Sequence, residues 1–110
     1  MPPTTNNSST AATITQGQLI VASPGAPQPL AFSKTLIEAV ELTPARDRAT
    51  QNLGNIWLGF LPANDSQLRL LRPVDQPYVI TAPPGKKIDL SSVYIDASTA
   101  GDGVIWTAIN

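Results

Sequence analysis

The chain has 110 residues, enough for one domain with a modest core, and charged residues make up only 14% of it. Its net charge of −1, with seven basic residues spread along the sequence, excludes the basic stripe of a nucleic-acid-binding protein. It has no cysteine and no histidine, which excludes disulfides, thiolate metal sites and the commonest general base. No apolar run approaches the length of a transmembrane helix, so we expect no membrane contact.

Two compositional features bear on the fold and the surface. The 11 prolines disfavour long helices and suit loops and strand edges. The sparse charge fits a surface that is covered by partner molecules, and it fits equally a surface of uncharged polar residues.

Residues 1–13 hold Pro, Thr, Asn, Ser and Ala with almost no apolar bulk. Such a segment cannot bury enough surface to offset the entropy lost on ordering. We expect either a flexible terminus or an arm that orders against a neighbouring subunit, followed by one β-domain over residues 14–110. The start lacks the basic and apolar regions of a secretion signal.

The first half of the domain mixes strand and loop signals. Residues 14–22 predict a strand, residues 23–29 an extended proline-rich loop, and residues 30–32 a short edge strand. Residues 34–43 carry a capping-box pattern, but the nearby prolines favour a strand with Ile37, Ala39 and Glu41 on one face. Residues 43–54 could form a helix, yet they offer almost no apolar face, so we expect a loop or irregular strand.

The second half shows a stronger β pattern. We expect residues 98–103 to form a hairpin loop between the last two strands, because Gly and Asp tolerate a positive φ. We expect a turn over residues 62–66. Short apolar runs at this spacing predict a small antiparallel β-sandwich or a jelly-roll-like barrel. The runs cover residues 55–61, 67–71, 78–80, 87–90, 93–97 and 104–109.

The runs 56–61 and 104–109 are apolar on both strand faces. In the first, Ile56, Leu58 and Phe60 alternate with Trp57 and Leu61. A strand with one buried face should instead alternate with polar residues. Either these strands are fully buried within the chain, or another subunit covers their outer face.

No pattern of residues predicts catalysis, a metal or a cofactor. A nucleophilic Ser or Thr would have no histidine to activate it, so we expect no enzyme. Asp96 and Asp102 could bind calcium, but their spacing matches no calcium loop, and an Asp beside Gly favours a turn. Trp57, Tyr78, Tyr94 and Trp106 could line a carbohydrate platform, although two Trp in a small β-domain more often serve as core or interface anchors.

Four segments, in this order, resemble the strand-and-turn pattern of small all-β virion structural proteins of tailed bacteriophages. They are Asn55–Gly59, Pro84–Leu90, Val93–Ala97 and Gly101–Val104. The similarity covers roughly residues 36–110, whereas the 43–53 segment and the 23–29 loop depart from it and leave the strand order open.

The resemblance implies a non-enzymatic capsid decoration protein on the outside of the virion head. Its partners would be the major capsid protein and further copies of the chain, as a trimer. Candidate interface residues are Ile14, Trp57, Phe60, Tyr94 and Trp106. The alternatives are a receptor- or carbohydrate-binding module of a tail spike or fibre, and a small tail-tube or capsid subunit.

Overall fold

The computed structural model describes residues 12–60 and 67–110. They form an all-β fold with ten strands, a single 3₁₀ turn and no longer helix among the described residues. The elements are β1 (Ile14–Ile20), β2 (Gln28–Pro29), β3 (Leu36–Ile37), β4 (Ala39–Pro44), β5 (Ile56–Gly59), β6 (Gln67–Leu71), β7 (Tyr78–Thr81), β8 (Ile88–Asp89), the 3₁₀ turn η2 (Leu90–Ser92), β9 (Tyr94–Ala97) and β10 (Gly103–Ile109).

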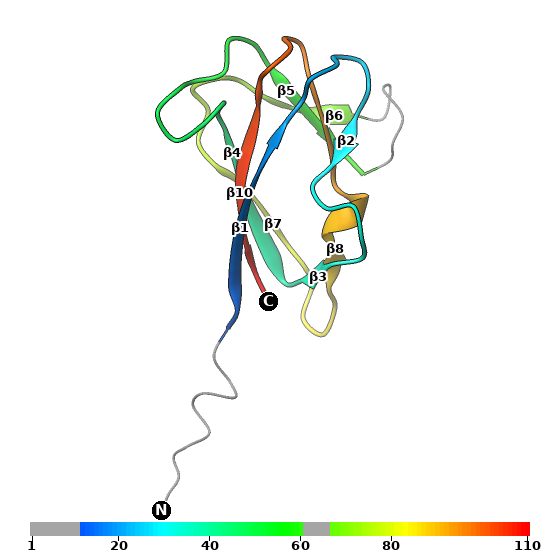
Figure 1. Cartoon of the computed structure of the whole chain (residues 1–110). Coiled ribbons are helices and arrows are strands. Elements are labelled where there is room, and N and C mark those ends of the chain that lie inside the picture. Colours follow the sequence, from blue (N-terminus) through cyan, green and yellow to red (C-terminus); the bar gives the residue numbers. More distant parts are fainter. Residues whose placement is uncertain (1–11, 61–66) are drawn as a thin grey trace, which may run out of the picture.

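Two four-stranded sheets form the sandwich (Figure 1). Sheet A has the order β1-β10-β4-β7, and sheet B has the order β2-β9-β5-β6. The short pair β3–β8 lies beside them, toward one end of the sandwich. All strand pairs are antiparallel.

The pairing is nested. β1 pairs with β10, β2 with β9, β3 with β8, β4 with β7, and β5 with β6. The chain is therefore one long antiparallel hairpin that folds over on itself, and the pairs β10–β4 and β5–β9 close it into two sheets. This arrangement is a jelly roll, and it confirms the all-β sandwich predicted from the sequence.

One hydrophobic core fills the space between the sheets. Alternate residues of each strand point into it, as the two-residue period of a strand requires. Its largest fully buried apolar side chains are Leu42 of β4, Ile56 and Leu58 of β5, Ile95 of β9, Val40 and Val104 of sheet A, and Val21, Leu90 and Val93 of the connections.

Trp106 belongs to this core and is only 9% exposed. It faces Gly17 across the β1–β10 pair, and a Cβ on Gly17 would overlap the indole ring. The missing side chain at Gly17 therefore makes the space in which the indole lies against β1.

The connection from β9 to β10 is not the predicted hairpin. β9 lies in sheet B and β10 lies in sheet A, so residues 98–102 cross from one sheet to the other. Gly101 does take the expected positive φ of 90°. The turn chemistry was therefore predicted correctly, but β10 takes β1 and β4 as its partners instead of β9.

Two predictions in the first half also change. Residues 30–32 are not a strand, and the edge strand is β2, just before them. The predicted strand over residues 34–43 breaks at a bend on Glu38, whose N–H donates to Ile109 while its carbonyl accepts from Ala82. Because of this bend, Ile37 and Val40 are both buried, whereas Ile37 was predicted to lie on the same strand face as Ala39. The segment 43–54, predicted as a loop or irregular strand, is a loop only from residue 45, because β4 continues through Pro44.

Phe60 does not share the buried face of Ile56 and Leu58. The register between β5 and β6 shifts between Leu58 and Gly59, and β5 ends at Gly59. Phe60 is consequently exposed. Leu61 and the turn predicted over residues 62–66 lie outside the described residues.

The predicted arm over residues 1–13 lies almost entirely outside the described residues. Thr13 is described, and it exchanges two backbone hydrogen bonds with Asn110, of 3.1 and 2.9 Å. The β1–β10 ladder therefore continues one residue beyond the strand.

Substitution of Gly17 tests the packing of the indole. We expect Gly17→Ala to lower the free energy of unfolding by about 1–3 kcal/mol, because the added Cβ must displace Trp106 or β1. Urea unfolding measures this loss. Val79→Ala, on an exposed residue of the same sheet, is the control and should change stability by about 0.5 kcal/mol at most. Equal stability of the Gly17→Ala variant and the native chain would contradict the close packing.

Candidate interaction surfaces

The carboxylate of Asp102 is fully buried and holds one end of the sandwich together. Its Oδ1 accepts from the Arg46 guanidinium at 2.8 Å and from the Leu53 N–H at 3.0 Å. Its Oδ2 accepts from the Gly54 N–H at 2.7 Å. The connection from β4 to β5 is thus attached to the connection from β9 to β10.

Asn52 strengthens the same junction. Its side-chain amide donates to the Gly103 carbonyl at 2.9 Å, and its Oδ1 accepts from the Gly103 N–H at 3.0 Å. The Asn52 side chain thereby bonds to both backbone groups of Gly103, as the backbone of a neighbouring strand would. Gly54 follows closely, and a Cβ there would overlap Ser98 and Thr99.

Asp96 performs a similar task on sheet B. Both of its carboxylate oxygens accept from the Gly25 N–H, at 2.9 and 3.1 Å, and Oδ1 also accepts from the Ala97 N–H at 2.8 Å. This attaches the turn over residues 23–26 to β9. The turn needs Gly25, whose φ is 92°.

These contacts explain both aspartates without calcium. Their oxygens face backbone donors and a guanidinium, which are groups that a cation would repel. Among residues 12–60 and 67–110, no three His, Cys, Asp or Glu side chains gather closely enough to hold a metal ion. Asp102 was predicted to serve turn geometry, and the structure adds its attachment of a second, distant loop.

The outer face of sheet A carries exposed apolar side chains. Strand register places Ile14 and Ile20 of β1, Ile109 of β10 and Val79 of β7 on this face. Ile14 is 65% exposed, and the other three are also exposed. No described element of the chain covers them.

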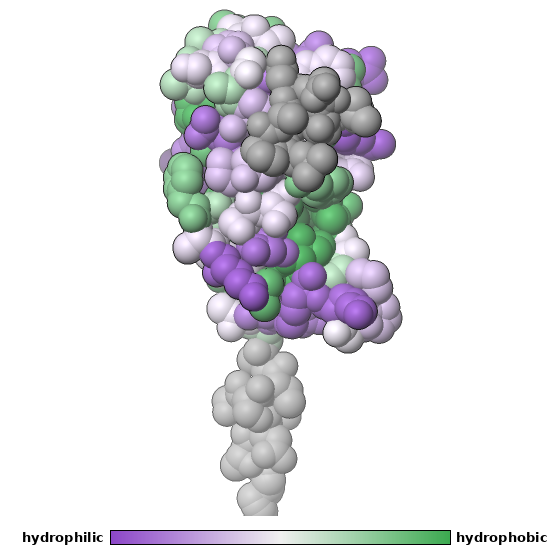
Figure 2. Space-filling view, turned by 90° about the vertical axis from the view of Figure 1, so that its right-hand side faces the viewer, coloured by the Kyte–Doolittle hydropathy of each residue, from purple (hydrophilic) through white to green (hydrophobic). Residues whose placement is uncertain are grey.

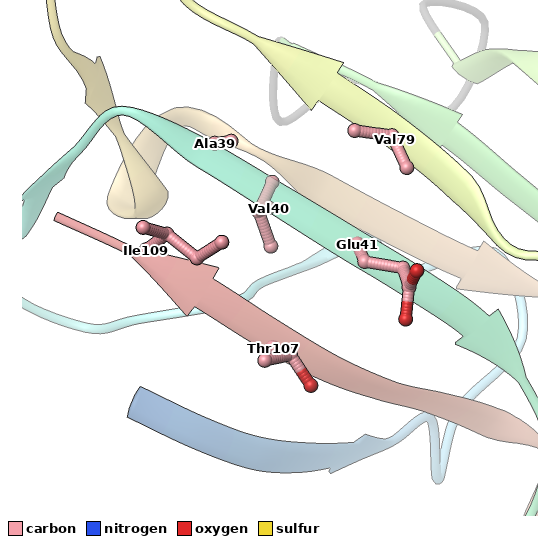
Figure 3. A pocket seen from close by; sticks show the side chains of 6 residues that line it. All are labelled: Ala39, Val40, Glu41, Val79, Thr107 and Ile109. Carbon is pink, nitrogen blue, oxygen red and sulfur yellow. The ribbon is translucent and has the colours of Figure 1, made fainter. Parts of the chain in front are cut away.

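A shallow depression of about 210 Å³ lies on this face (Figure 3). Its lining comes from three adjacent strands, with Ile109 and Thr107 on β10, Val79 on β7, and Ala39, Val40 and Glu41 on β4. Glu41 supplies its only charge. The depression can accommodate an apolar side chain beside a donor that pairs with the Glu41 carboxylate.

The outer face of sheet B has a second, aromatic surface. Trp57 is 36% exposed and lies between Leu70 of β6 and Asp96 of β9. Tyr94 is half-buried on the same face, opposite Gly59. Figure 2, which faces the side of β2 and β6, shows hydrophobic surface next to hydrophilic surface. Trp and Tyr are not green on its hydropathy scale, so the hydrophobic surface there comes from other residues.

The five predicted interface residues therefore occupy different places. Ile14 lies on the outer face of sheet A, and Trp57 and Tyr94 lie on the outer face of sheet B. Phe60 is exposed just beyond β5. Trp106 lies in the core, which leaves it little surface for a partner.

The four aromatic residues considered for a carbohydrate platform do not form one. Trp106 is buried, and the ring of Tyr78 packs against the core and lies 4.4 Å beneath the Arg69 guanidinium. Trp57 and Tyr94 alone share an outer face.

Of the exposed residues on the outer face of sheet A, sequence reasoning found only Ile14. Ile109, Val79 and Glu41 meet there because β10, β4 and β7 are neighbours, although they come from distant parts of the chain. The available signal was the run 104–109, which is apolar on both faces. Ile109 and Trp57 are exposed, so full burial within the described chain does not explain such runs.

No family model, curated protein or solved structure matches this chain. Within the described residues, no helix is long and apolar enough to span a membrane.

Removal of the Asp102 carboxylate should destabilise the fold severely. We expect Asp102→Ala to cost about 3 kcal/mol or more in unfolding free energy, because two backbone N–H groups and Arg46 lose their acceptor. The control is Asp75→Ala, which breaks the exposed contact with Arg72 and should cost about 1 kcal/mol or less. Comparable losses in urea unfolding would show that Asp102 does not hold the junction.

Acid should weaken the fold through Asp89. Hydrogen bonds from the Thr35 N–H and then from Ser91 hold the pKa of Asp89 below its ordinary 3.8. A lowered folded-state pKa contributes stability above 3.8 that is lost as pH falls through the folded value. Unfolding measured at pH 6 and stepwise below pH 4 should show this loss, and Asp89→Asn should reduce it. An identical acid profile for the variant would contradict the assignment.

Proposed function

We propose that this chain is a non-enzymatic structural protein of a tailed-phage virion that decorates the outside of the head. The observation that carries the proposal is the pair of strands with two apolar faces. In each strand, one apolar face points into the core. The other face leaves Trp57 exposed on the outer side of sheet B and Ile109 exposed on the outer side of sheet A. A chain that exposes apolar residues on both sheets is suited to contact neighbours on both sides.

The rigidity of the sandwich ends also supports the proposal. The buried side chains of Asp102, Asn52 and Asp96 attach the long connections to the sheets through hydrogen bonds. Rigid loops lose little conformational entropy when a partner binds them. A protein that acts by holding capsid subunits in place gains from such a preorganised body.

The fold agrees with this use at the level of analogy. Jelly rolls occur in viral capsid domains and in lectins, so the topology alone selects neither. The virion assignment rests on the resemblance of residues 36–110 to small virion proteins. We keep the trimeric state as a prediction of that resemblance.

A carbohydrate-binding module of a tail spike or fibre is the second candidate. The shared outer face of Trp57 and Tyr94 favours it, because aromatic faces stack on sugar rings. Glycan binding by the full chain that is lost in Trp57→Ala, with unchanged thermal stability, would support this function over decoration.

Copy number on the particle tests the head assignment. We expect quantitative mass spectrometry of virions from the encoding phage to find the chain at a copy number comparable to that of capsid capsomers. A handful of copies would place it in the tail or a fibre. Its absence from purified virions would reject the virion proposal.

Substitution on sheet A tests the surface itself. We expect Ile109→Arg to weaken attachment to heads assembled without this chain by about tenfold or more, because a charge would have to be buried in the apolar contact. Val74→Arg changes another exposed apolar residue, on the connection from β6 to β7, and should leave attachment unchanged. Co-sedimentation with heads measures both, and equal binding would exclude this face as the contact.

A further inference from the structure

Strand β1 forms one edge of sheet A and is long, regular and unprotected. It has seven residues, contains neither charge nor proline, and keeps an unbroken register with β10. Among the described residues, no strand pairs with its other side. Proteins usually protect such an edge, because its free N–H and C=O groups can pair with another chain.

The other sheet edges carry the usual protection. β2 has two residues and includes Pro29. β6 contains Arg69 and has a shifted register with β5. β7 has four residues and lies between Pro77 and Pro83. The contrast marks β1 as an edge that is left open to a partner.

Hydrogen bonding within the chain fixes which groups of β1 are free. Thr13 and Asn110 exchange both backbone bonds, so the residues that bond to β10 alternate from Thr13 onward. The even-numbered residues of β1 therefore direct their N–H and C=O away from β10. They are Ile14, Gln16, Gln18 and Ile20, and all four are exposed.

The sequence of β1 is self-complementary about Gly17. In an antiparallel pair centred there, Ile14 faces Ile20 of the other copy and Gln16 faces Gln18. Each of these pairs joins two residues whose free groups point toward the partner, so the hydrogen-bonding phase is correct. Gly17 meets its own copy on the axis, where the absence of a side chain permits close approach of the backbones.

We propose that a second copy of this chain occupies the edge, through two-fold antiparallel pairing of β1 with β1. The two copies of sheet A become one eight-stranded sheet. Its outer face at the junction carries an Ile14–Ile20 pair at each end and Gln16–Gln18 pairs between them. The contact is isologous and closes after two chains. It does not depend on the virion assignment, and it differs from the three-fold association that the family resemblance implies.

Mass and amide exchange of the full chain test the pairing. Sedimentation equilibrium should give a dimer. In the dimer, the N–H groups of Gln16, Gln18 and Ile20 should exchange slowly, and dilution to monomer should restore fast exchange. A chain that stays monomeric at its highest soluble concentration overturns the proposal. A dimer in which these amides exchange rapidly also overturns it.

Proline substitution separates this edge from the other. Gln16→Pro removes an N–H that no described residue of the chain accepts, and it should raise the dimer dissociation constant at least about tenfold without a large change in melting temperature. Thr81→Pro is the matched control on the opposite edge of sheet A. The Ala82 N–H donates to Glu38, so alternation directs the Thr81 N–H outward, and this variant should remain dimeric.

A pair of charge variants tests the register even if the proline variant fails to fold. The Gln18 amide donates to the Arg46 carbonyl, and both variants lose that contact equally. Q16E/Q18E places carboxylates opposite each other, whereas Q16K/Q18E places Lys opposite Glu. The second should dimerise at least about tenfold more tightly in low salt, and the gap should narrow as salt is added. Equal dissociation constants would overturn the pairing about Gly17.

The outcomes also separate this inference from the proposed function. A trimer that Gln16→Pro leaves intact would overturn β1 pairing and support the predicted three-fold state. A β1-dependent dimer that is absent from purified virions would uphold the pairing and reject decoration.

Discussion

One end of this sandwich depends on the hydrogen bonds that the buried carboxylate of Asp102 accepts. Three connections meet there: the one from β1 to β2, the one from β4 to β5, and the one from β9 to β10. Its side chain accepts from Arg46, Leu53 and Gly54, its carbonyl accepts from the Val21 N–H, and its own N–H donates to Thr99. Apart from Val21, these loops add no buried apolar side chain to the core, so their shape comes mainly from polar contacts that support one another. The contacts at Asp102 therefore fix how these loops lie against the two sheets.

Local sequence predicted the strands well, and the pairing poorly. β6 matches its predicted span, and β10 differs from its prediction by one residue, because alternation of apolar residues is a local property. Pairing depends on which distant strand competes best. Residues 98–103 have the composition of a hairpin, yet β10 pairs with β1 and β4 instead. The prediction that Phe60 shares a face with Leu58 was wrong for a more local reason, because one shift in register after Leu58 ends the alternation.

The candidate surfaces were harder to predict than the strands for the same physical reason. Trp57 stands out in any sequence because it is large and aromatic. Ile109 and Val79 are ordinary residues, and they form a surface only when nested pairing makes β10 and β7 neighbours of β4. Conversely, the size of Trp106 suggested an anchor for a partner, but Gly17 provides space for it inside the chain. Side-chain size alone does not distinguish an interface from a core.

The nested topology also governs how the molecule can be made. β10 is the last strand along the chain, yet it lies in the interior of sheet A between β1 and β4. During synthesis β1 emerges early and has no partner until nearly the whole domain has left the ribosome. Its uncharged edge is then exposed on both sides, and pairings over such sequence distances form slowly. We therefore expect encounters between unfolded chains to compete with closure of the sheet for as long as β10 is unpaired.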